Sequence, residues 1–197
     1  MELPGREWLT RCAIDPGEAR ATWQRDPAAP LTMATGHYFD AIIVPDRLGL
    51  ETCDLIRQHR LPLGPAMLDT HARKVGFIAP PRGRLAFSTV TRAVEVSMRQ
   101  LHYLSEGDFV VVPGPSPLPN SRYQWLYAPT QRADPSRLRS ATLAVILCTA
   151  ARNLARHDLA SIFTRIPSPP PCAPIASPGP TSEDSSAATT QVQGANR

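Results

Sequence analysis

The chain has 197 residues, which is enough for one globular domain with its own core. A hydrophobic fraction of 42% is typical of a folded soluble protein, while 22 prolines are unusually many. The net charge of +4 is too small to indicate nucleic-acid binding by itself, and Lys74 is the only lysine among the 21 basic residues.

Three patterns exclude other classes of protein. The four cysteines (Cys12, Cys53, Cys148 and Cys172) are scattered, and none has the Cys/His spacing of a structural zinc site. No apolar segment follows a basic N-terminus, as it would in a secretory signal. The longest apolar run, Ala141 to Ala151, has about half of the roughly 20 residues that a membrane span requires. The sequence therefore predicts a reduced, cytoplasmic protein without a membrane segment.

The first third of the chain begins with apolar, helical segments between Arg6 and Arg25. Asp15 followed by Pro16 predicts a helix start, because Asp is a favoured N-cap and Pro a favoured first helical residue. The prolines after Arg25 end that helix. A short strand and turn are expected at 31–36, and the apolar run 39–44 is typical of a central strand buried on both faces.

The middle of the chain predicts a helix at 48–60 and two paired strands at 66–68 and 75–79. Residues 85–98 are ambiguous between a short helix and a strand around Val94 and Val96. The runs 101–104 and 109–112, joined by a Ser105–Asp108 turn, predict a β-hairpin.

The remaining elements are a strand at 123–127 and a long helix at about 136–164. This order of helices and strands implies a mixed α+β domain. We expect this domain to span residues 1–166. Residues 167–197 are rich in Pro, Ser and Thr, and we expect a disordered tail there.

Several motifs occur in a fixed order along the chain. They are Glu18–Trp23, Thr35–Pro45 with Gly49 shortly after, Leu63–Pro65, Val75–Pro80, Gly107–Pro113 and Trp125–Pro129. As an ordered set, they resemble the short actinobacterial members of the bifunctional DNA primase/polymerase N-terminal domain family. The resemblance covers roughly Trp8 to Ala151.

The resemblance implies a primase-type α+β fold with a largely antiparallel sheet and flanking helices. In active members of the family, one strand carries an Asp-x-Asp pair, a Gly-rich strand carries a histidine, and a later strand carries a third acidic residue. The carboxylates hold two divalent cations about 3.5–4 Å apart for phosphoryl transfer. An active domain would therefore need Mg²⁺ or Mn²⁺ as its cofactor, and no cofactor is expected otherwise.

Placed on this sequence, the Asp-x-Asp positions fall at Ile43 and Pro45, which have no ligand oxygen in their side chains. The histidine position falls near Lys74, with His71 displaced from it, and the third acidic position falls near His102. The resemblance thus implies a conserved scaffold that lacks its metal-binding carboxylates.

The candidate catalytic residues that remain are Asp40, Asp46, His71 and His102, and no metal ligand is assigned. Asp40 is three residues before Ile43, so on an extended strand it faces the opposite side. The alternative role of Asp46 is to cap the helix that follows it. The alternative for the histidines, including His37, is a surface or partly buried neutral side chain.

The candidate nucleic-acid contacts are Arg73, Lys74, Arg82 and Arg84, because positive charge binds the phosphate backbone. Their alternative is a solvated basic edge strand that protects a sheet from aggregation. The tryptophans could stack on bases, although core packing is the alternative that their apolar neighbours favour.

Three hypotheses about function follow. The leading one is a primase/polymerase-like domain without nucleotidyl transfer, which binds nucleic acid or a nucleotide and acts as a binding or regulatory module. The second is an active, template-directed polymerase that uses displaced carboxylates such as Asp40, Asp46 and Asp108. The third is an adaptor that binds a protein partner through the polyproline segment Pro167–Pro171.

Overall fold

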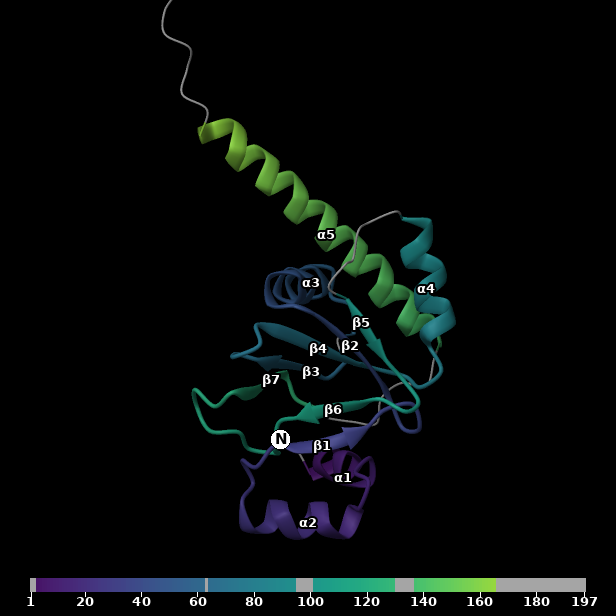
Figure 1. Ribbon diagram of the computed structural model, residues 1–197, viewed down its shortest axis with the longest axis vertical. Coiled ribbons are helices and arrows are strands. Elements are labelled where there is room, and N and C mark those ends of the chain that lie inside the picture. Colours follow the sequence, from purple (N-terminus) through teal and green to yellow (C-terminus); the bar gives the residue numbers. More distant parts are fainter. Residues whose placement is uncertain (1–2, 63, 95–100, 130–136, 166–197) are drawn as a thin grey trace, which may run out of the picture.

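The computed structural model describes residues 3–62, 64–94, 101–129 and 137–165, which form an α+β domain (Figure 1). The helices are α1 (Leu3–Arg11), α2 (Pro16–Arg25), α3 (Asp46–Gln58), α4 (Arg84–Ala93) and α5 (Arg137–Arg165). The strands are β1 (Leu31–Ala34), β2 (Asp40–Pro45), β3 (Ala66–Asp69), β4 (Lys74–Ala79), β5 (His102–Leu104), β6 (Phe109–Val112) and β7 (Tyr123–Tyr127). The tail expected at 167–197 and its polyproline segment lie outside the described residues.

All of the strand pairs are antiparallel. Five strands form one sheet in the order β5-β2-β4-β3-β7, and β1 pairs with β6 in a separate two-stranded sheet. The predicted central strand is confirmed, because β2 lies between β5 and β4 and its residues Ala41, Ile42 and Val44 are fully buried. The mixed α+β fold with an antiparallel sheet is confirmed as well.

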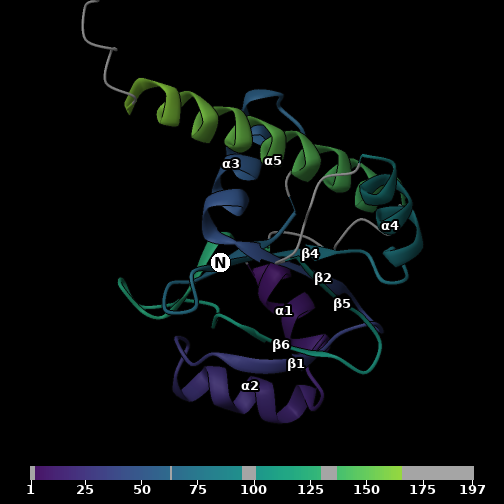
Figure 2. The same ribbon diagram turned by 45° about the horizontal axis from the view of Figure 1, so that its top comes forward.

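One face of the five-stranded sheet is covered by α3, α4 and α5, and α5 packs across the other two helices (Figure 2). Alternate strand residues point to this face, as the two-residue period of a strand requires. They form a core with side chains from the helices: Ile42, Val44, Ala66, Val75, Phe77, Ala79, Cys53, Phe87, Ala144 and Leu147. This core attaches α3, α4 and α5 to one face of the five-stranded sheet.

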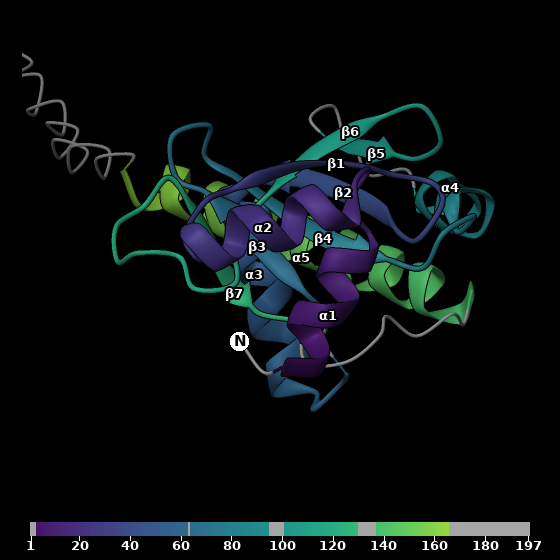
Figure 3. The same cartoon turned by 90° about the horizontal axis from the view of Figure 1, so that it is seen from below.

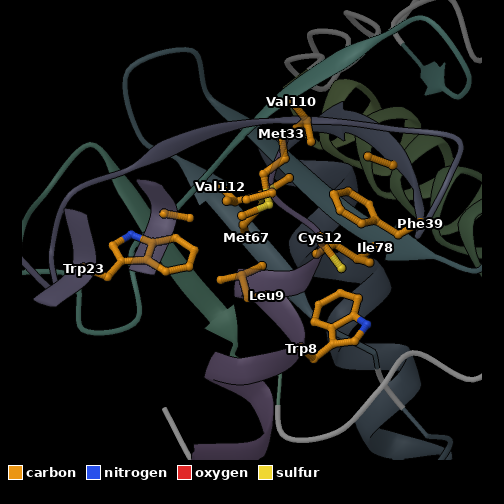
Figure 4. Close-up of a cluster of buried hydrophobic side chains, with 13 residues drawn as sticks. Trp8, Leu9, Cys12, Trp23, Met33, Phe39, Met67, Ile78, Val110 and Val112 are labelled. Atoms are coloured by element: carbon orange, nitrogen blue, oxygen red, sulfur yellow. The ribbon is translucent and has the colours of Figure 1, made fainter. Parts of the chain in front are cut away.

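The opposite face of the sheet is partly covered by the β1–β6 sheet and by α1 and α2. In this second core, side chains of the small sheet (Met33, Val110 and Val112) point toward Met67 and Ile78 of the large sheet (Figure 4). The α1–α2 segment completes the core with Trp8, Leu9, Cys12 and Trp23. Trp8 is 8% exposed and Trp23 is fully buried, so core packing is confirmed for both. Trp23 Nε1 also donates to Ala29 O at 2.9 Å.

The predicted hairpin between 101–104 and 109–112 is wrong. β5 pairs with β2, whereas β6 pairs with β1, so the two strands belong to different sheets. The turn between them exists, with Asp108 N donating to Ser105 O. Thr35 explains the divergence, because its hydroxyl donates to Ser105 O at 2.6 Å and its backbone N–H donates to Asp108 O. These bonds bring β1 alongside β6 directly after the turn.

Local sequence signals, such as capping residues, correctly predicted most of the helices. Asp15 is the N-cap of α2 and accepts a hydrogen bond from Glu18 N at 2.9 Å, as predicted. The ambiguous stretch after residue 84 is the helix α4, and the position of Val96 lies outside the described residues. None of the described helices combines the length and the apolar character that crossing a membrane would need.

Gly49 lets α3 approach the sheet closely, since a Cβ at this position would lie 2.3 Å from Val75 Cβ. In an exposed helix, Gly→Ala stabilises by about 1 kcal/mol. Here the collision with Val75 has the larger effect, and we expect Gly49→Ala to lower the free energy of unfolding by about 2 kcal/mol. Urea unfolding measures it. The control Gly17→Ala, at an exposed position in the first turn of α2, should not lower the free energy of unfolding and should raise it by up to about 1 kcal/mol.

Candidate functional site

An open cleft of about 240 Å³ lies where the five-stranded sheet extends beyond the cover of β6. Its lining is mostly apolar and comes from β2, β3, β4, β6, β7 and the β3–β4 turn: Ile43, Met67, Leu68, Asp69, Ala72, Lys74, Gly76, Phe109, Val110, Val111 and Tyr123. We refer to it as the sheet cleft.

Strand register explains why these side chains share one face. Gly76 of β4 lies opposite Ile43 on one side and Met67 on the other, and directly opposed residues of antiparallel strands point the same way. A Cβ at Gly76 would lie 2.7 Å from Met67 Cε and 3.0 Å from Ile43 Cδ1. The missing side chain of Gly76 therefore lets Ile43 and Met67 meet across β4, and together these residues make an apolar floor.

The charged side chains gather at the end of the cleft that is next to the β3–β4 turn. Arg122 binds Asp69 through two hydrogen bonds, Nε to Oδ1 at 3.0 Å and Nη2 to Oδ2 at 2.9 Å. Arg73 Nε donates to Asp46 Oδ2 at 2.8 Å. Lys74 lies between the two pairs in register, opposite Asp69 on one side and Pro45 on the other.

Both aspartates of these pairs are stabilised in the ionised form. The hydrogen bond from Arg73 lowers the pKa of Asp46. Burial opposes ionisation of Asp69, but hydrogen bonds from Arg122 and from the backbone N–H of Ala72 bring its pKa below the ordinary value. The ammonium group of Lys74, in contrast, makes no hydrogen bond and no ion pair within the described residues. It is thus available to a ligand in the sheet cleft.

Two aromatic side chains border the cleft. Phe109 is 58% exposed although it begins the apolar strand β6, so its ring faces solvent beside the cleft. Tyr123 lies under the guanidinium of Arg122, which is 4.8 Å from the ring centroid. An apolar floor with exposed aromatic edges and one unpaired ammonium suits a flat aromatic group that carries a nearby anion.

The positions that the resemblance assigns to metal ligands come together in the fold. Ile43 lies directly opposite His102 of β5, and Pro45 lies opposite Lys74. Ile43 and Pro45 are two residues apart on one strand and therefore face the same side. Ile43, Lys74 and His102 are far apart in the chain, and the pairing of β2 with β4 and β5 brings their strands side by side.

Asp40 lies on the other face of the sheet, as its strand position predicted. It is fully buried, and its Oδ2 accepts hydrogen bonds from Tyr103 Oη at 2.9 Å and from Gly83 N at 3.3 Å. Burial raises the pKa of Asp40 above the ordinary value of 3.8, against the opposing effect of these bonds. Its geometry is that of a buried link between β2, β5 and the start of α4, on the side away from the cleft.

The other candidate side chains do not join Asp40. Asp46 is the first residue of α3 rather than its N-cap, which is Pro45, and its carboxylate binds Arg73. His71 is exposed in the β3–β4 turn, and His102 is exposed on β5. Asp108 accepts a hydrogen bond from Ser105 N within its own turn. Across the described ranges, no three His, Cys, Asp or Glu side chains are placed to hold a metal ion.

The four basic candidates divide into two pairs at opposite ends of β4. Arg73 and Lys74 are beside the sheet cleft, whereas Arg82 and Arg84 follow the far end of the strand, where Arg84 Nη1 donates to Ser105 Oγ at 3.1 Å. The alternative of a basic edge strand is wrong, because β4 pairs with β2 on one side and β3 on the other. Arg73 and Lys74 are therefore the basic candidates that can act together with the side chains lining the sheet cleft.

Sequence reasoning missed Asp69, Phe109 and Tyr123 as cleft residues. Asp69 ends a short strand and looks like an ordinary turn residue, while Phe109 belongs to an apolar run that predicts burial. No local motif marks either residue. Their proximity follows from the pairing of β3 with β7 and from the position of β6 over the sheet.

The fold and the site define an α+β domain with an antiparallel sheet and an open cleft on one face. A family model described as bifunctional DNA primase/polymerase, N-terminal, matches residues 3–140 of the chain. The chain therefore belongs to this family, and it carries a DNA primase/polymerase-like domain. No curated protein and no solved structure matches it.

The side chains at the presumed metal positions do not fit two divalent cations. Ile43 and Pro45 offer no oxygen, and Mg²⁺ requires hard oxygen ligands. The nearest carboxylates at that end of the cleft, Asp46 and Asp69, are held by Arg73 and Arg122. An ion there would have to compete with an arginine for each of these two carboxylates.

Proposed function

We propose that this chain is a primase/polymerase-like domain without nucleotidyl transfer, which binds single-stranded nucleic acid or a nucleotide in the sheet cleft and acts as a binding or regulatory module. The observation that supports the proposal is the pairing of Ile43 with His102, two positions to which the resemblance assigns metal-binding carboxylates. Binding requires only the scaffold and the cleft, both of which the chain has, and it needs no metal ion.

The lining of the cleft supports binding in two ways. Phe109 presents an exposed ring, and stacking on an aromatic side chain is worth about 1–3 kcal/mol per base. Lys74 supplies an ammonium that is not neutralised by an ion pair in the described residues, and phosphate oxygens are its natural ligands. Base and phosphate of one nucleotide can thus be held by adjoining parts of one cleft.

The charge of the cleft also argues against tight triphosphate binding. Arg73 and Arg122 are engaged by Asp46 and Asp69, so Lys74 is the one cleft cation without an ion pair in the part of the chain that the structure describes. A nucleoside triphosphate carries several negative charges that active members of the family neutralise with metal ions as well as with basic side chains. Single-stranded nucleic acid, with one charge per phosphate, fits this cleft better.

Binding to a fluorescein-labelled single-stranded DNA, measured by anisotropy, tests the proposal. We expect saturable binding that is unchanged by EDTA, because no divalent ion takes part. Phe109→Ala should weaken it about ten-fold through lost stacking. Lys74→Gln should weaken it and reduce the slope of log K against log salt by about 0.7.

The matched controls are Leu118→Ala, an equally exposed apolar residue outside the cleft, and Arg92→Gln, which removes one charge from α4. Both should bind the DNA like the unchanged chain. The same preparation should show no templated incorporation with Mg²⁺ or Mn²⁺. Templated extension of a primer, or DNA binding that needs a divalent ion, would overturn the proposal.

A further inference from the structure

The helices α1 and α2 lie on the outer side of the domain, away from α3 and α5 (Figure 3). Side chains of these two helices line a second, polar groove. It has a volume of about 270 Å³ and is lined by Arg6, Glu7, Thr10, Arg11, Arg20 and Gln24. It shares no residue with the sheet cleft, and all of its lining residues are polar or charged. We call it the α1–α2 groove.

Helix periodicity explains why these polar side chains meet. The apolar side of α1 contains Trp8 and Leu9, that of α2 contains Ala19 and Trp23, and all four side chains are buried in the core. The remaining faces are polar. Arg20 and Gln24 are four residues apart, so they lie one above the other on the side of α2 that borders the groove.

The groove has an excess of positive charge. Three guanidinium groups are present with one carboxylate, which gives a local charge of +2, half of the net charge of the whole chain. Within the described residues, the one ion pair of the groove joins Arg11 Nη2 and Glu7 Oε2 at 3.9 Å, and it is weak because both side chains are at least 70% exposed.

Arg6 and Arg20 have no carboxylate partner in the part of the chain that the structure describes. Other arginines of the domain are neutralised internally: Arg47 binds Asp158, Arg73 binds Asp46 and Arg122 binds Asp69. The α1–α2 groove is thus a place where the fold gathers like charges and leaves them uncompensated, and an anion would relieve their repulsion.

We propose that the α1–α2 groove binds phosphate groups. Guanidinium is planar and always charged, and its fork of N–H donors matches two oxygens of one phosphate. Three such forks, with the amide of Gln24 beside them, suit a ligand with several adjacent phosphates. Two sources share this chemistry: the backbone of a nucleic-acid strand and a free pyrophosphate or polyphosphate. The inference does not depend on the function proposed for the sheet cleft.

Titration of the full chain with sodium pyrophosphate and with a single-stranded DNA, followed by calorimetry, tests the inference. We expect saturable binding that weakens as salt is raised, and a loss of about ten-fold in Arg6→Gln/Arg20→Gln. The exposed single variant Arg11→Gln should also bind more weakly, which covers the case that the double variant is unstable. Phe109→Ala should leave pyrophosphate binding unchanged, since Phe109 lies in the other cleft.

The matched control is Arg25→Gln, which removes the same charge from α2 outside the groove and should bind like the unchanged chain. If Arg6→Gln/Arg20→Gln weakens the binding of DNA and pyrophosphate does not bind, the source is a strand; if the double variant weakens the binding of both, the phosphate group itself is the ligand. The inference is wrong if neither probe binds saturably, or if Arg25→Gln loses as much affinity as Arg6→Gln/Arg20→Gln.

Discussion

A variant with Ile43→Asp, Pro45→Asp and His102→Asp is expected to bind Mn²⁺, whereas the unchanged chain is not. The three positions converge because Ile43 faces His102 across two paired strands and Pro45 follows two residues later on the same face. Three carboxylates placed there supply the hard oxygen ligands that the natural side chains lack.

The substitutions are compatible with the local structure. Pro45 is the N-cap of α3, where Asp is a favoured residue, and His102 is exposed. Ile43 is half-buried beside the cleft, so its replacement will cost some stability. This loss lowers the free energy of unfolding of the metal-free variant, but the three carboxylates remain in place to bind the ion.

Chemical unfolding with and without Mn²⁺ measures the effect. At about 100 times the dissociation constant, the ion should raise the free energy of unfolding of the variant by about 2.7 kcal/mol. The control is Ile43→Asn, Pro45→Asn, His102→Asn, which has nearly the same shape and no negative charge, and it should show no such gain. If the unchanged chain is itself stabilised by Mn²⁺, or if the carboxylate variant is not, these positions are not the ancestral metal site.

Asp40→Ala is expected to lower the free energy of unfolding by about 2–4 kcal/mol, because it leaves the buried N–H of Gly83 and the hydroxyl of Tyr103 without their acceptor. The loss should affect the packing of α4 and β5 against β2, since Asp40 is bonded to both. Asp40→Asn keeps an acceptor oxygen in place and should cost much less. Urea unfolding at constant pH compares the two variants.

The pH dependence of these variants tests the burial of Asp40 separately. Burial raises the pKa of this carboxyl above 3.8 in the folded state, so the stability associated with its protonated form is present below that pH and is lost as pH rises through the raised value. Asp40→Asn does not titrate. Its free energy of unfolding, minus that of the unchanged chain, should therefore increase from about pH 4 to about pH 7.

A difference that stays constant over this range would mean that Asp40 titrates normally and is not desolvated. Comparing Asp40→Ala with Asp40→Asn also distinguishes an effect on folding stability from a direct chemical role of the carboxylate. A loss of any activity in Asp40→Ala alone reflects the broken link to Gly83 and Tyr103, whereas a loss in the stable Asp40→Asn variant would point to a role of the carboxylate itself.

Much of the fold could be predicted because its signals are local. Asp15 and Pro16 mark the start of α2 by capping chemistry that involves only neighbouring residues. The run from Ala41 to Val44 is apolar throughout, so burial on both faces was readable from its composition. The lack of oxygen ligands at Ile43 and Pro45 is also a property of the sequence alone, given the family resemblance.

Pairing and proximity depended on the tertiary structure. The runs on either side of the Ser105–Asp108 turn have the pattern of a hairpin, and only the bonds from Thr35 direct β6 to β1 instead. Likewise, Gly49 is unfavourable for helix propensity and is explained by Val75 beneath it.

The sequence by itself determined most of the helices and strands, although not α4, and that the expected metal positions carry no carboxylate, because both depend on the chemistry of individual side chains and their immediate neighbours. The tertiary structure decided that Asp69, Lys74 and Phe109 border one cleft, that Asp40 faces away from it, and that Arg6 and Arg20 meet in a second groove. These contacts join segments that are distant in the chain, and no local pattern specifies which strands or helices will lie side by side.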